Sequence, residues 1–194
     1  IARNNIDILH AHVARDYLAA AVAARVAKRA KLVLTRHVLF PLKPFHKIAL
    51  KNVDAAVAVS PAVAVELANI FPRNKIHTIP NGLDVTLPED LVEIGHEFRA
   101  FHKIPLDALL VLAIGELKPL KGQIDLVLAA AEVVKKIPNA HFCITGVDNS
   151  GGRRFRRELR RLAATLGISD RFTWLDWIED TRPAFSAADL FVSP

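Results

Sequence analysis

A short loop holds the residues of this chain that are best suited to bind an anion. The loop GELKPLKG begins at Gly115, directly after the apolar run ALLVLAIG, and a helix is predicted from Gly122 onward. The carboxyl ends of parallel strands and the positive ends of helices both bind anions. Lys121 adds a mobile positive charge of the kind that suits a diphosphate. We therefore interpret this loop as a candidate anion site, with a solvated loop lysine as the alternative.

Histidines gather at the ends of two other apolar runs. His10 and His12 end one predicted strand and His37 ends the next. Strand alternation places His10 and His12 on the same face, at a sheet edge where ligands bind in parallel α/β proteins. A structural role is the alternative. The chain lacks a metal-ligand pattern such as His-x-x-x-His with an acidic partner, so no structural zinc is expected.

An arginine-rich run and a single cysteine could also be functional, but the residues around each favour a structural role. The run RRFRRELRR is rich in arginine, but Phe155, Leu159 and Leu162 recur at helical spacing. This spacing favours a surface helix with its arginines on the solvated side over a nucleic-acid site. Cys143 lies in the apolar run AHFCITG, which predicts a buried and inert thiol.

Short apolar runs alternate with longer amphipathic runs throughout, and this alternation predicts an α/β fold with parallel sheets. Ser60-Pro61 is a strong helix start, because serine accepts a backbone N–H and proline suits the first helical position. The predicted helices are 16–30, 122–137 and one that begins at Ser60-Pro61. The predicted strands are 6–12, 31–37, 55–60, 75–80, 108–115, 140–146, 171–176 and 190–193. The charged stretch from Asp84 to Pro105 is predicted to be a helical or irregular connection between two such halves.

The composition is that of a globular protein, with 52% hydrophobic and 24% charged residues among 194. Up to Val85 the chain has 12 Lys+Arg against 5 Asp+Glu, a net charge of +7, and the remainder has 14 against 15, or −1. A basic first half suits an anionic partner such as a lipid head group or a phosphorylated acceptor, with solubility as the alternative. Because no leader and no apolar run of about 18 residues is present, a cytoplasmic location is expected.

Three stretches, in this order, resemble family 4 of the glycosyltransferases. They are DAAVAVSPAVAVELANIFPRNKIHTIPNGLDV, LLVLAIGELKPLKGQIDLVLAAAEVVKKIPNAHFCITG and LGISDRFTWLDWIEDTRPAFSAADLFVSP. The resemblance implies the GT-B fold, in which two Rossmann-like domains face each other across a cleft, each here present in part. Residues 1–85 would belong to the acceptor-side domain and residues 86–194 to the hinge and the donor-nucleotide domain, with KIHTIPNGLDV at the boundary.

The resemblance also implies roles for residues around the predicted anion site. Lys121 would hold the donor diphosphate, and Gly115 and Gly146 would let the backbone approach the donor closely. Glu116 departs from the family, which usually has arginine there. A carboxylate at that point would repel a diphosphate and weaken its binding. Either Glu116 points away, or this protein binds its donor differently, or its donor site is impaired.

Other positions follow from the same resemblance. Trp177 or Ile178 would lie against the nucleobase, with a packed core tryptophan as the alternative. His12 and His37 would face the donor sugar or the acceptor. Asp148 and Asp176 stand where glycines are frequent, and the catalytic region of the family, Glu-x7-Glu, would follow Pro194.

By resemblance the protein would be a retaining glycosyltransferase of the hexosyltransferase type. It would move a sugar from a nucleotide-diphosphate-sugar to an acceptor sugar or glycolipid. The product would belong to cell-envelope, glycolipid or polysaccharide synthesis. Neither a metal nor another cofactor is expected, and nucleic acid is not expected as a partner. A chain ending at Pro194 is expected to be inactive alone. Peripheral contact with an anionic membrane is a further expectation. The alternatives are an epimerase-like GT-B enzyme and a non-catalytic relative acting as a binding module.

Overall fold

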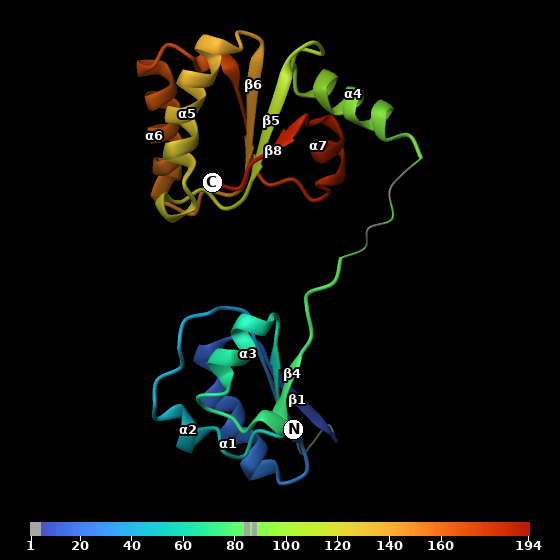
Figure 1. Ribbon diagram of the computed structural model, residues 1–194, viewed down its shortest axis with the longest axis vertical. Coiled ribbons are helices and arrows are strands. Elements are labelled where there is room, and N and C mark those ends of the chain that lie inside the picture. Colours follow the sequence, from blue (N-terminus) through green and yellow to red (C-terminus); the bar gives the residue numbers. More distant parts are fainter. Residues whose placement is uncertain (1–4, 84–85, 87–88) are drawn as a thin grey trace. The chain divides into compact units, whose positions relative to one another are not determined.

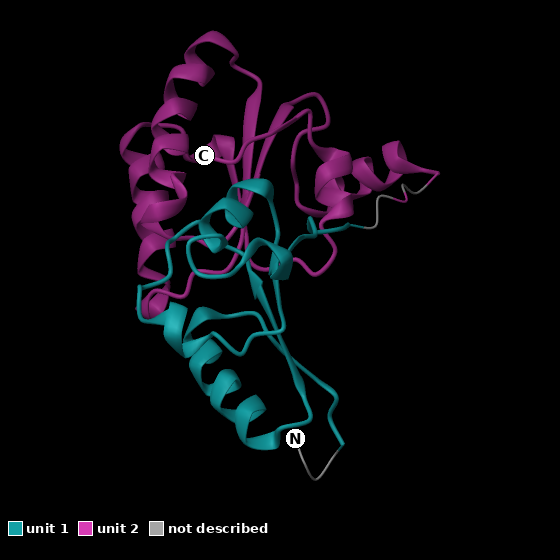
Figure 2. Cartoon of the chain, turned by 60° about the horizontal axis from the view of Figure 1, so that its bottom comes forward, with its two compact units in different colours: residues 1–85 teal, residues 86–194 magenta. Residues whose placement is uncertain are grey.

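The chain folds into two compact units, Ile1–Val85 and Thr86–Pro194 (Figure 2). The computed structural model describes residues 5–83, 86 and 89–194. Asp84 and Val85, the last residues of the predicted hinge run, lie outside the described residues. Each unit is an α/β structure around its own parallel sheet, as the alternation of apolar and amphipathic runs predicts.

Unit 1 is built on a four-stranded parallel sheet in the order β1-β2-β3-β4 (Figure 1). Its strands are β1 (Ile8–Ala11), β2 (Lys31–Arg36), β3 (Ala55–Ala58) and β4 (Ile76–Thr78). Its helices are α1 (Tyr17–Ala27), α2 (His46–Ala49) and α3 (Pro61–Leu67). Ser60 caps α3 by accepting the N–H of Val63 at 3.3 Å, with Pro61 at the first helical position, so the predicted helix start is confirmed.

Unit 2 contains a second parallel sheet, in the order β7-β6-β5-β8. Its strands are β5 (Leu109–Ile114), β6 (Ala140–Thr145), β7 (Phe172–Leu175) and β8 (Leu190–Phe191). Its helices are α4 (Leu91–Phe101), α5 (Gln123–Lys136), α6 (Arg154–Thr165) and α7 (Arg182–Ala187). Within this unit α5 and α6 cover one face of the sheet and α4 and α7 the other (Figure 1).

Strand alternation divides the core of unit 2 into two layers. Phe142 and Ile144 pack with α5 and α6, whereas Leu110, Leu112 and Cys143 pack with α4 and α7. Both faces of the sheet are therefore apolar, which explains why these strands are continuous apolar runs rather than alternating ones. Cys143 is fully buried and burial raises its pKa to about 12, which confirms the predicted inert thiol.

The register of the sheet brings three strand ends level. Ile114 of β5 pairs with Thr145 of β6, which pairs with Leu175 of β7. The loops that follow these strands therefore begin side by side at one edge of the sheet.

A buried arginine ties the first helix of unit 2 to its sheet. Arg99 on α4 donates to the carbonyl oxygens of Ala187 and Ala108 and to the carboxylate of Asp189 at 2.9 Å. It donates also to the carbonyl oxygens of Pro105 and Leu106. Asp189 in turn accepts the N–H of Leu110 at 2.7 Å. The guanidinium thus joins the chain before β5 to the chain before β8, a function that no spacing in the sequence indicated.

The elements differ from the predicted ones mainly at their ends. All eight predicted strands are present but are shorter, and β8 covers only Leu190–Phe191 of the predicted 190–193. The helix predicted over 16–30 ends at Ala27, because Lys28 adopts a left-handed conformation with φ 56°. The interval from Asp84 to Pro105 contains α4, and α7 was not predicted.

Replacing Arg99 with methionine should destabilise unit 2 strongly. The substitution leaves Asp189 without its charged partner and several carbonyl oxygens without the donor Arg99, so we expect the free energy of unfolding to fall by about 3 kcal/mol or more. Both tryptophans lie in unit 2, so urea denaturation followed by tryptophan fluorescence measures this change.

Lys135→Met is the matched control, because Lys135 pairs with Glu132 at 2.6 Å on an exposed helix surface. We expect a change below about 0.5 kcal/mol there. Equal effects of the two substitutions would contradict the structural role of Arg99.

Candidate functional site

Three loops meet at the carboxyl edge of the unit 2 sheet. They follow β5, β6 and β7 and begin at Gly115, Gly146 and Asp176. Backbone hydrogen bonds join the first two beyond the strands, from Gly115 N to Thr145 O at 3.0 Å and from Leu117 N to Val147 O at 2.8 Å. The sheet hydrogen bonding therefore continues into the loops and holds them together.

Gly146 is the point of closest approach between these loops. Its φ is +151°, and a Cβ atom built on it would lie 1.8 Å from the carbonyl oxygen of Gly115. No side chain fits at that distance, so only glycine lets the β5 and β6 loops come together here. The sequence drew attention to Gly146 as a point of approach to a ligand, whereas the structure shows that it approaches Gly115.

A pocket of about 380 Å³ opens where the three loops meet. It brings together five residues that the resemblance singled out, namely Gly115, Glu116, Gly146, Trp177 and Ile178. Residues that sequence reasoning did not select complete the lining, namely Ile114, Thr145, Val147, Asn149 and Thr181. A concave site with apolar walls and a few polar groups is the usual form of a small-molecule site.

The two large apolar side chains of this pocket differ in burial. The Trp177 residue is 73% exposed, so the alternative of a packed core tryptophan is wrong. Ile178 is half-buried and packs against the core on the α4 and α7 side of the sheet. Trp177 is therefore an exposed apolar residue of the pocket lining, and Ile178 is a half-buried one.

The carboxylate of Glu116 is held at the pocket by two neighbours. Lys118 Nζ donates to one oxygen at 2.5 Å and Asn149 Nδ2 donates to the other at 3.2 Å. The hydrogen bond from Lys118, followed by that from Asn149, holds the pKa of Glu116 below its ordinary value. Glu116 is therefore an ionised group whose charge is partly offset by Lys118.

Lys121 lies beside this pocket rather than in it. It lines an adjacent small hollow together with Gly115, Gln123, Ser193 and others. The 3-10 turn Pro119–Lys121 precedes α5, and Gly122 joins the two in a left-handed conformation with φ 68°. Lys121 thus sits at the positive end of a 14-residue helix, which is the arrangement predicted for an anion site.

Gln123 holds the loop between Glu116 and Lys121 by a hydrogen bond from its buried side chain. Its residue is only 4% exposed and its Nε2 donates to the carbonyl oxygen of Glu116 at 3.0 Å. Its Oε1 is buried and has no hydrogen-bond partner among the described residues. No sequence pattern indicated this role, because Gln123 occupies an ordinary first position of a helix.

Asp148 and Arg156 support the loop after β6. Asp148 accepts the N–H and the hydroxyl of Ser150 and the N–H of Arg156, at 2.6 to 2.8 Å, and so caps the start of α6. Desolvation acts against ionisation, but the hydrogen bonds from Ser150 and Arg156 outweigh it and lower the pKa of Asp148. The side chain at this position, where the family frequently has glycine, is therefore a structural cap.

One arginine of the run RRFRRELRR is not solvated. Arg156 is 5% exposed and donates to the carbonyl oxygens of Gly146 at 2.7 Å and Leu175 at 2.8 Å. It also pairs with Asp176 at 3.0 Å. The prediction that the arginines lie on the solvated side is wrong for Arg156, because the carbonyl oxygens at the ends of β6 and β7 need a buried donor.

In unit 1 the histidines cluster at the carboxyl edge of the sheet. His12 Nδ1 and His37 Nε2 lie 3.2 Å apart, and His10 Nε2 lies 2.7 Å from Thr35 Oγ1. The rings of His10 and His12 are 4.1 Å apart, which confirms that they share a face. Burial, then the neighbouring His12 and His37, lower the pKa of His10. The described residues of the chain contain no group of three or more side chains suited to a metal ion.

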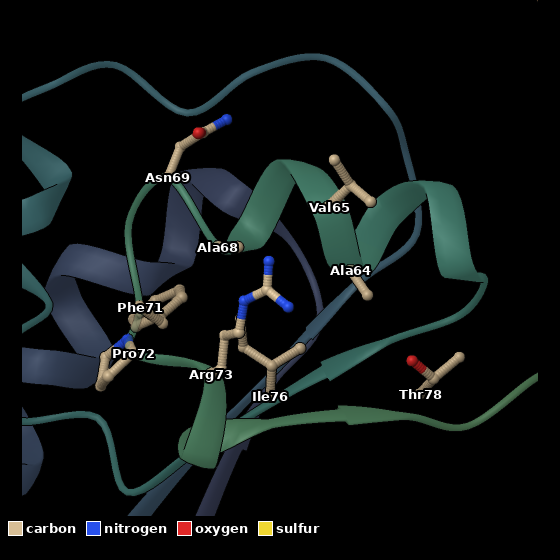
Figure 3. A pocket seen from close by; sticks show the side chains of 9 residues that line it. All are labelled: Ala64, Val65, Ala68, Asn69, Phe71, Pro72, Arg73, Ile76 and Thr78. Carbon is tan, nitrogen blue, oxygen red and sulfur yellow. The ribbon is translucent and has the colours of Figure 1, made fainter.

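A larger hollow, of about 670 Å³, lies elsewhere in unit 1, between α3 and β4. Figure 3 shows small apolar side chains such as Ala64 and Ala68 along it, with the Arg73 side chain pointing toward α3. It has a single ionisable group, Arg73, and none of the predicted site residues. Size alone therefore does not make it the candidate site.

Together the fold and the site define an α/β protein of two parallel-sheet units, one of which has a loop pocket at the carboxyl edge of its sheet. Comparison with known families agrees with this description. Residues 1–87 match the family described as Glycosyltransferase Family 4, and residues 96–194 match the Glycosyl transferases group 1. The chain therefore belongs to the glycosyltransferases that these two family models describe, and the predicted resemblance is confirmed.

Two curated relatives illustrate the match. The chain is 29% identical to the lipopolysaccharide core biosynthesis glycosyltransferase LpsE of Rhizobium meliloti, over 73% of this chain and 37% of that protein. It is 30% identical to D-inositol 3-phosphate glycosyltransferase 2 of Catenulispora acidiphila, over 73% of this chain and 34% of that protein. The chain thus spans about a third of the length of these relatives.

Solved structures show that the fold is of the GT-B type. Anabaena HepE in complex with UDP-glucose matches with a TM-score of 0.76 and 22% identity, over 95% of this chain and 52% of that one. A glycosyltransferase from Rickettsia africae matches with a TM-score of 0.80 and 21% identity, over 98% and 52%. In the described part of this chain, no helix is long and apolar enough to cross a membrane.

Gly146→Ala tests the contact between the two loops. Since the new methyl group would overlap the carbonyl oxygen of Gly115, the β5 and β6 loops must separate, and we expect a loss of about 3 kcal/mol of stability. Urea denaturation measures the change. Gly151→Ala is the control, because a Cβ there meets no atom within 4 Å, and a comparable loss in that variant would argue against the proposed contact.

The cap made by Asp148 predicts a pH dependence. Because the folded-state pKa of Asp148 lies below its ordinary value of 3.8, its ionised form contributes stability above pH 3.8 that is lost as the pH falls further. Asp148→Asn cannot accept all three hydrogen bonds, so it should be less stable than the wild type at neutral pH. The difference should shrink in acid. The exposed Asp107→Asn serves as control, and a difference for Asp148→Asn that does not change with pH would refute the cap.

Proposed function

We propose that the full-length protein is a retaining glycosyltransferase that moves a hexose from a nucleotide-diphosphate-sugar to a sugar or glycolipid acceptor. One observation supports this most directly: the loops after β5, β6 and β7 gather five of the predicted donor-site residues around one pocket. HepE, whose fold this chain shares, has been solved with UDP and with UDP-glucose.

In this proposal unit 2 binds the donor nucleotide. Trp177 and Ile178 provide an apolar wall and floor for the nucleobase. Lys121 and the N-terminus of α5 neutralise the diphosphate, so that no metal ion is required. Gly115 and Gly146, which have no side chains, let the donor approach the backbone closely.

Glu116 sets a limit on how tightly the donor binds. Its carboxylate lines the pocket, but Lys118 and Asn149 already engage both of its oxygens. The diphosphate therefore meets a carboxylate whose charge is partly offset rather than a bare one. This arrangement weakens binding relative to a cation at the same place.

Unit 1 has the acceptor-side role in the proposal. His12 and His37 contact each other through one ring nitrogen each at the carboxyl edge of its sheet, and in the proposal their other ring nitrogens hydrogen-bond sugar hydroxyl groups. The lipopolysaccharide core enzyme among the relatives supports a role in the synthesis of cell-envelope glycans. The predicted membrane contact rests on charge and is not needed for this function.

A second candidate function is that of a non-catalytic binding module, which the carboxylate of Glu116 in the donor pocket favours. Full-length protein incubated with UDP-glucose and a panel of sugar and lipid acceptors distinguishes the two. Release of UDP that depends on an acceptor, with the anomeric configuration retained in the product by NMR, supports the transferase. Binding of UDP without any such release supports the binding module, and the absence of binding refutes both.

Glu116→Arg should tighten the binding of UDP. The substitution removes a negative charge from the pocket, adds a positive one and frees Lys118, so we expect affinity to rise by about tenfold or more in calorimetry on the full-length protein. Glu132→Arg makes the same charge change on an exposed part of α5 and is the control. Unchanged or weaker binding by Glu116→Arg would show that the diphosphate does not lie near residue 116.

Lys121→Ala should have the opposite effect. Without the ammonium group, only the helix end remains to neutralise the diphosphate, and we expect UDP affinity to fall on the order of tenfold. Lys136→Ala, at the other end of α5, is the control measured in the same calorimetry. Equal affinities of the Lys121→Ala protein and the wild type would remove Lys121 from the proposed site.

A further inference from the structure

The loop after β5 contains a second lysine, Lys118, besides Lys121. Lys118 Nζ donates to Glu116 Oε2 at 2.5 Å, and Glu116 lines the pocket of about 380 Å³. No sequence pattern singled out Lys118. Its ammonium group is nevertheless in contact with a residue of the pocket lining, so it lies next to the place proposed for the donor.

Backbone hydrogen bonds hold this lysine in place. Leu117, directly before it, is 2% exposed and donates its N–H to the carbonyl oxygen of Val147 at 2.8 Å. The carbonyl oxygen of Lys118 accepts the N–H of Lys121 at 2.9 Å. The main chain is therefore fixed just before Lys118 and at Lys118 itself, and its side chain starts from a defined point.

The ion pair between Lys118 and Glu116 contributes little to folding. The two side chains are 41% and 39% exposed, and ion pairs with this much access to water are weak. The ammonium group has no other hydrogen-bond partner among the described residues. A role in stabilising unit 2 therefore does not account for the place of Lys118 beside the pocket.

The same carboxylate meets several donors and charges. Asn149 Nδ2 donates to the other oxygen of Glu116 at 3.2 Å. The hydrogen bonds from Lys118 and Asn149 and, more weakly, the charge of Lys121 lower the pKa of Glu116. An ammonium group has three protons to donate, and Glu116 accepts one of them. Lys118 therefore has two N–H groups left for an acceptor beside Glu116.

We propose that Lys118 is a donor-binding residue whose ammonium group hydrogen-bonds the diphosphate, and that Glu116 positions it. This inference rests on the proposed function, because it takes the pocket as the donor site. Glu116 and Lys118 together carry no net charge, so the pair adds directed hydrogen bonds, while Lys121 and the helix end supply the excess positive charge. The carboxylate holds the ammonium group in place before the ligand arrives, which reduces the ordering cost of binding.

The competing explanation is that Lys118 only offsets the charge of Glu116. In that case Lys118 would matter for binding only while residue 116 is charged. If Nζ contacts the diphosphate, Lys118 matters also when residue 116 is neutral. Glu116→Gln separates the two explanations, because the amide has nearly the size of the carboxylate and no charge.

Calorimetry with UDP on the full-length protein tests the proposal as a double-mutant cycle. Lys118→Met should lower UDP affinity by about tenfold or more in the wild type. In the Glu116→Gln background the same substitution should still lower it by about fivefold or more. Lys118→Arg keeps a cationic donor and should bind UDP within about threefold of the wild type. Uridine, which has no phosphate, should bind all these variants equally.

Glu132 and Lys135 provide a matched pair for the control. They form an ion pair of the same kind at 2.6 Å on the exposed surface of α5. Lys135→Met, alone and together with Glu132→Gln, should change UDP affinity by less than about twofold. Urea denaturation followed by tryptophan fluorescence shows that each variant is folded, since both tryptophans lie in unit 2.

Three results would overturn the proposal. If Lys118→Met has no effect in the Glu116→Gln background, Lys118 only offsets Glu116. If uridine binding falls as much as UDP binding, Lys118 does not act on the diphosphate. If the wild type binds UDP and Lys121→Ala weakens it while Lys118→Met does not, the donor site stands and the role of Lys118 alone is refuted. A wild type that binds no UDP refutes the proposed function itself.

Discussion

The candidate site depends on the contact between two backbones at Gly146 and Gly115. A side chain at residue 146 would overlap the carbonyl oxygen of Gly115, so this contact exists only because residue 146 is glycine with a positive φ. The contact lets the loops after β5 and β6 continue the hydrogen bonding of the strands. The pocket wall that bears Glu116 and the wall that bears Asn149 are joined for the same reason.

Hydrogen bonds from polar side chains then hold the loops after β5 and β6 in place. Arg156 satisfies the carbonyl oxygens at the ends of β6 and β7, and Asp148 caps the helix that carries Arg156. Gln123 holds the loop after β5 through the carbonyl oxygen of Glu116. Each of these side chains pairs with a backbone group at the end of a strand or at the start of a helix. The pocket is thus formed by loops, but its geometry is set by buried hydrogen bonds.

Charge is distributed differently in the two units, and this affects what each can bind. Around the pocket of unit 2, Glu116 and Lys118 offset one another, while Lys121 lies at the helix end nearby. In unit 1 the sequence from His37 to Val53 contains three lysines and no aspartate or glutamate. The arrangement in unit 2 suits a compact anion, such as the diphosphate of the proposed donor.

The sequence by itself determined the fold class, because strand periodicity is a local feature. Its resemblance to known glycosyltransferases determined the family and half of the residues that line the pocket. Gly115, Glu116, Gly146, Trp177 and Ile178 were all selected from that resemblance. Only the tertiary structure decided that Trp177 is exposed and that Arg156 is buried. It also decided that Gln123 holds the loop after β5 and that Asn149 lines the pocket. Those outcomes depend on which strand ends lie level and which carbonyl oxygens need a donor, and both are set by contacts between residues distant in the sequence.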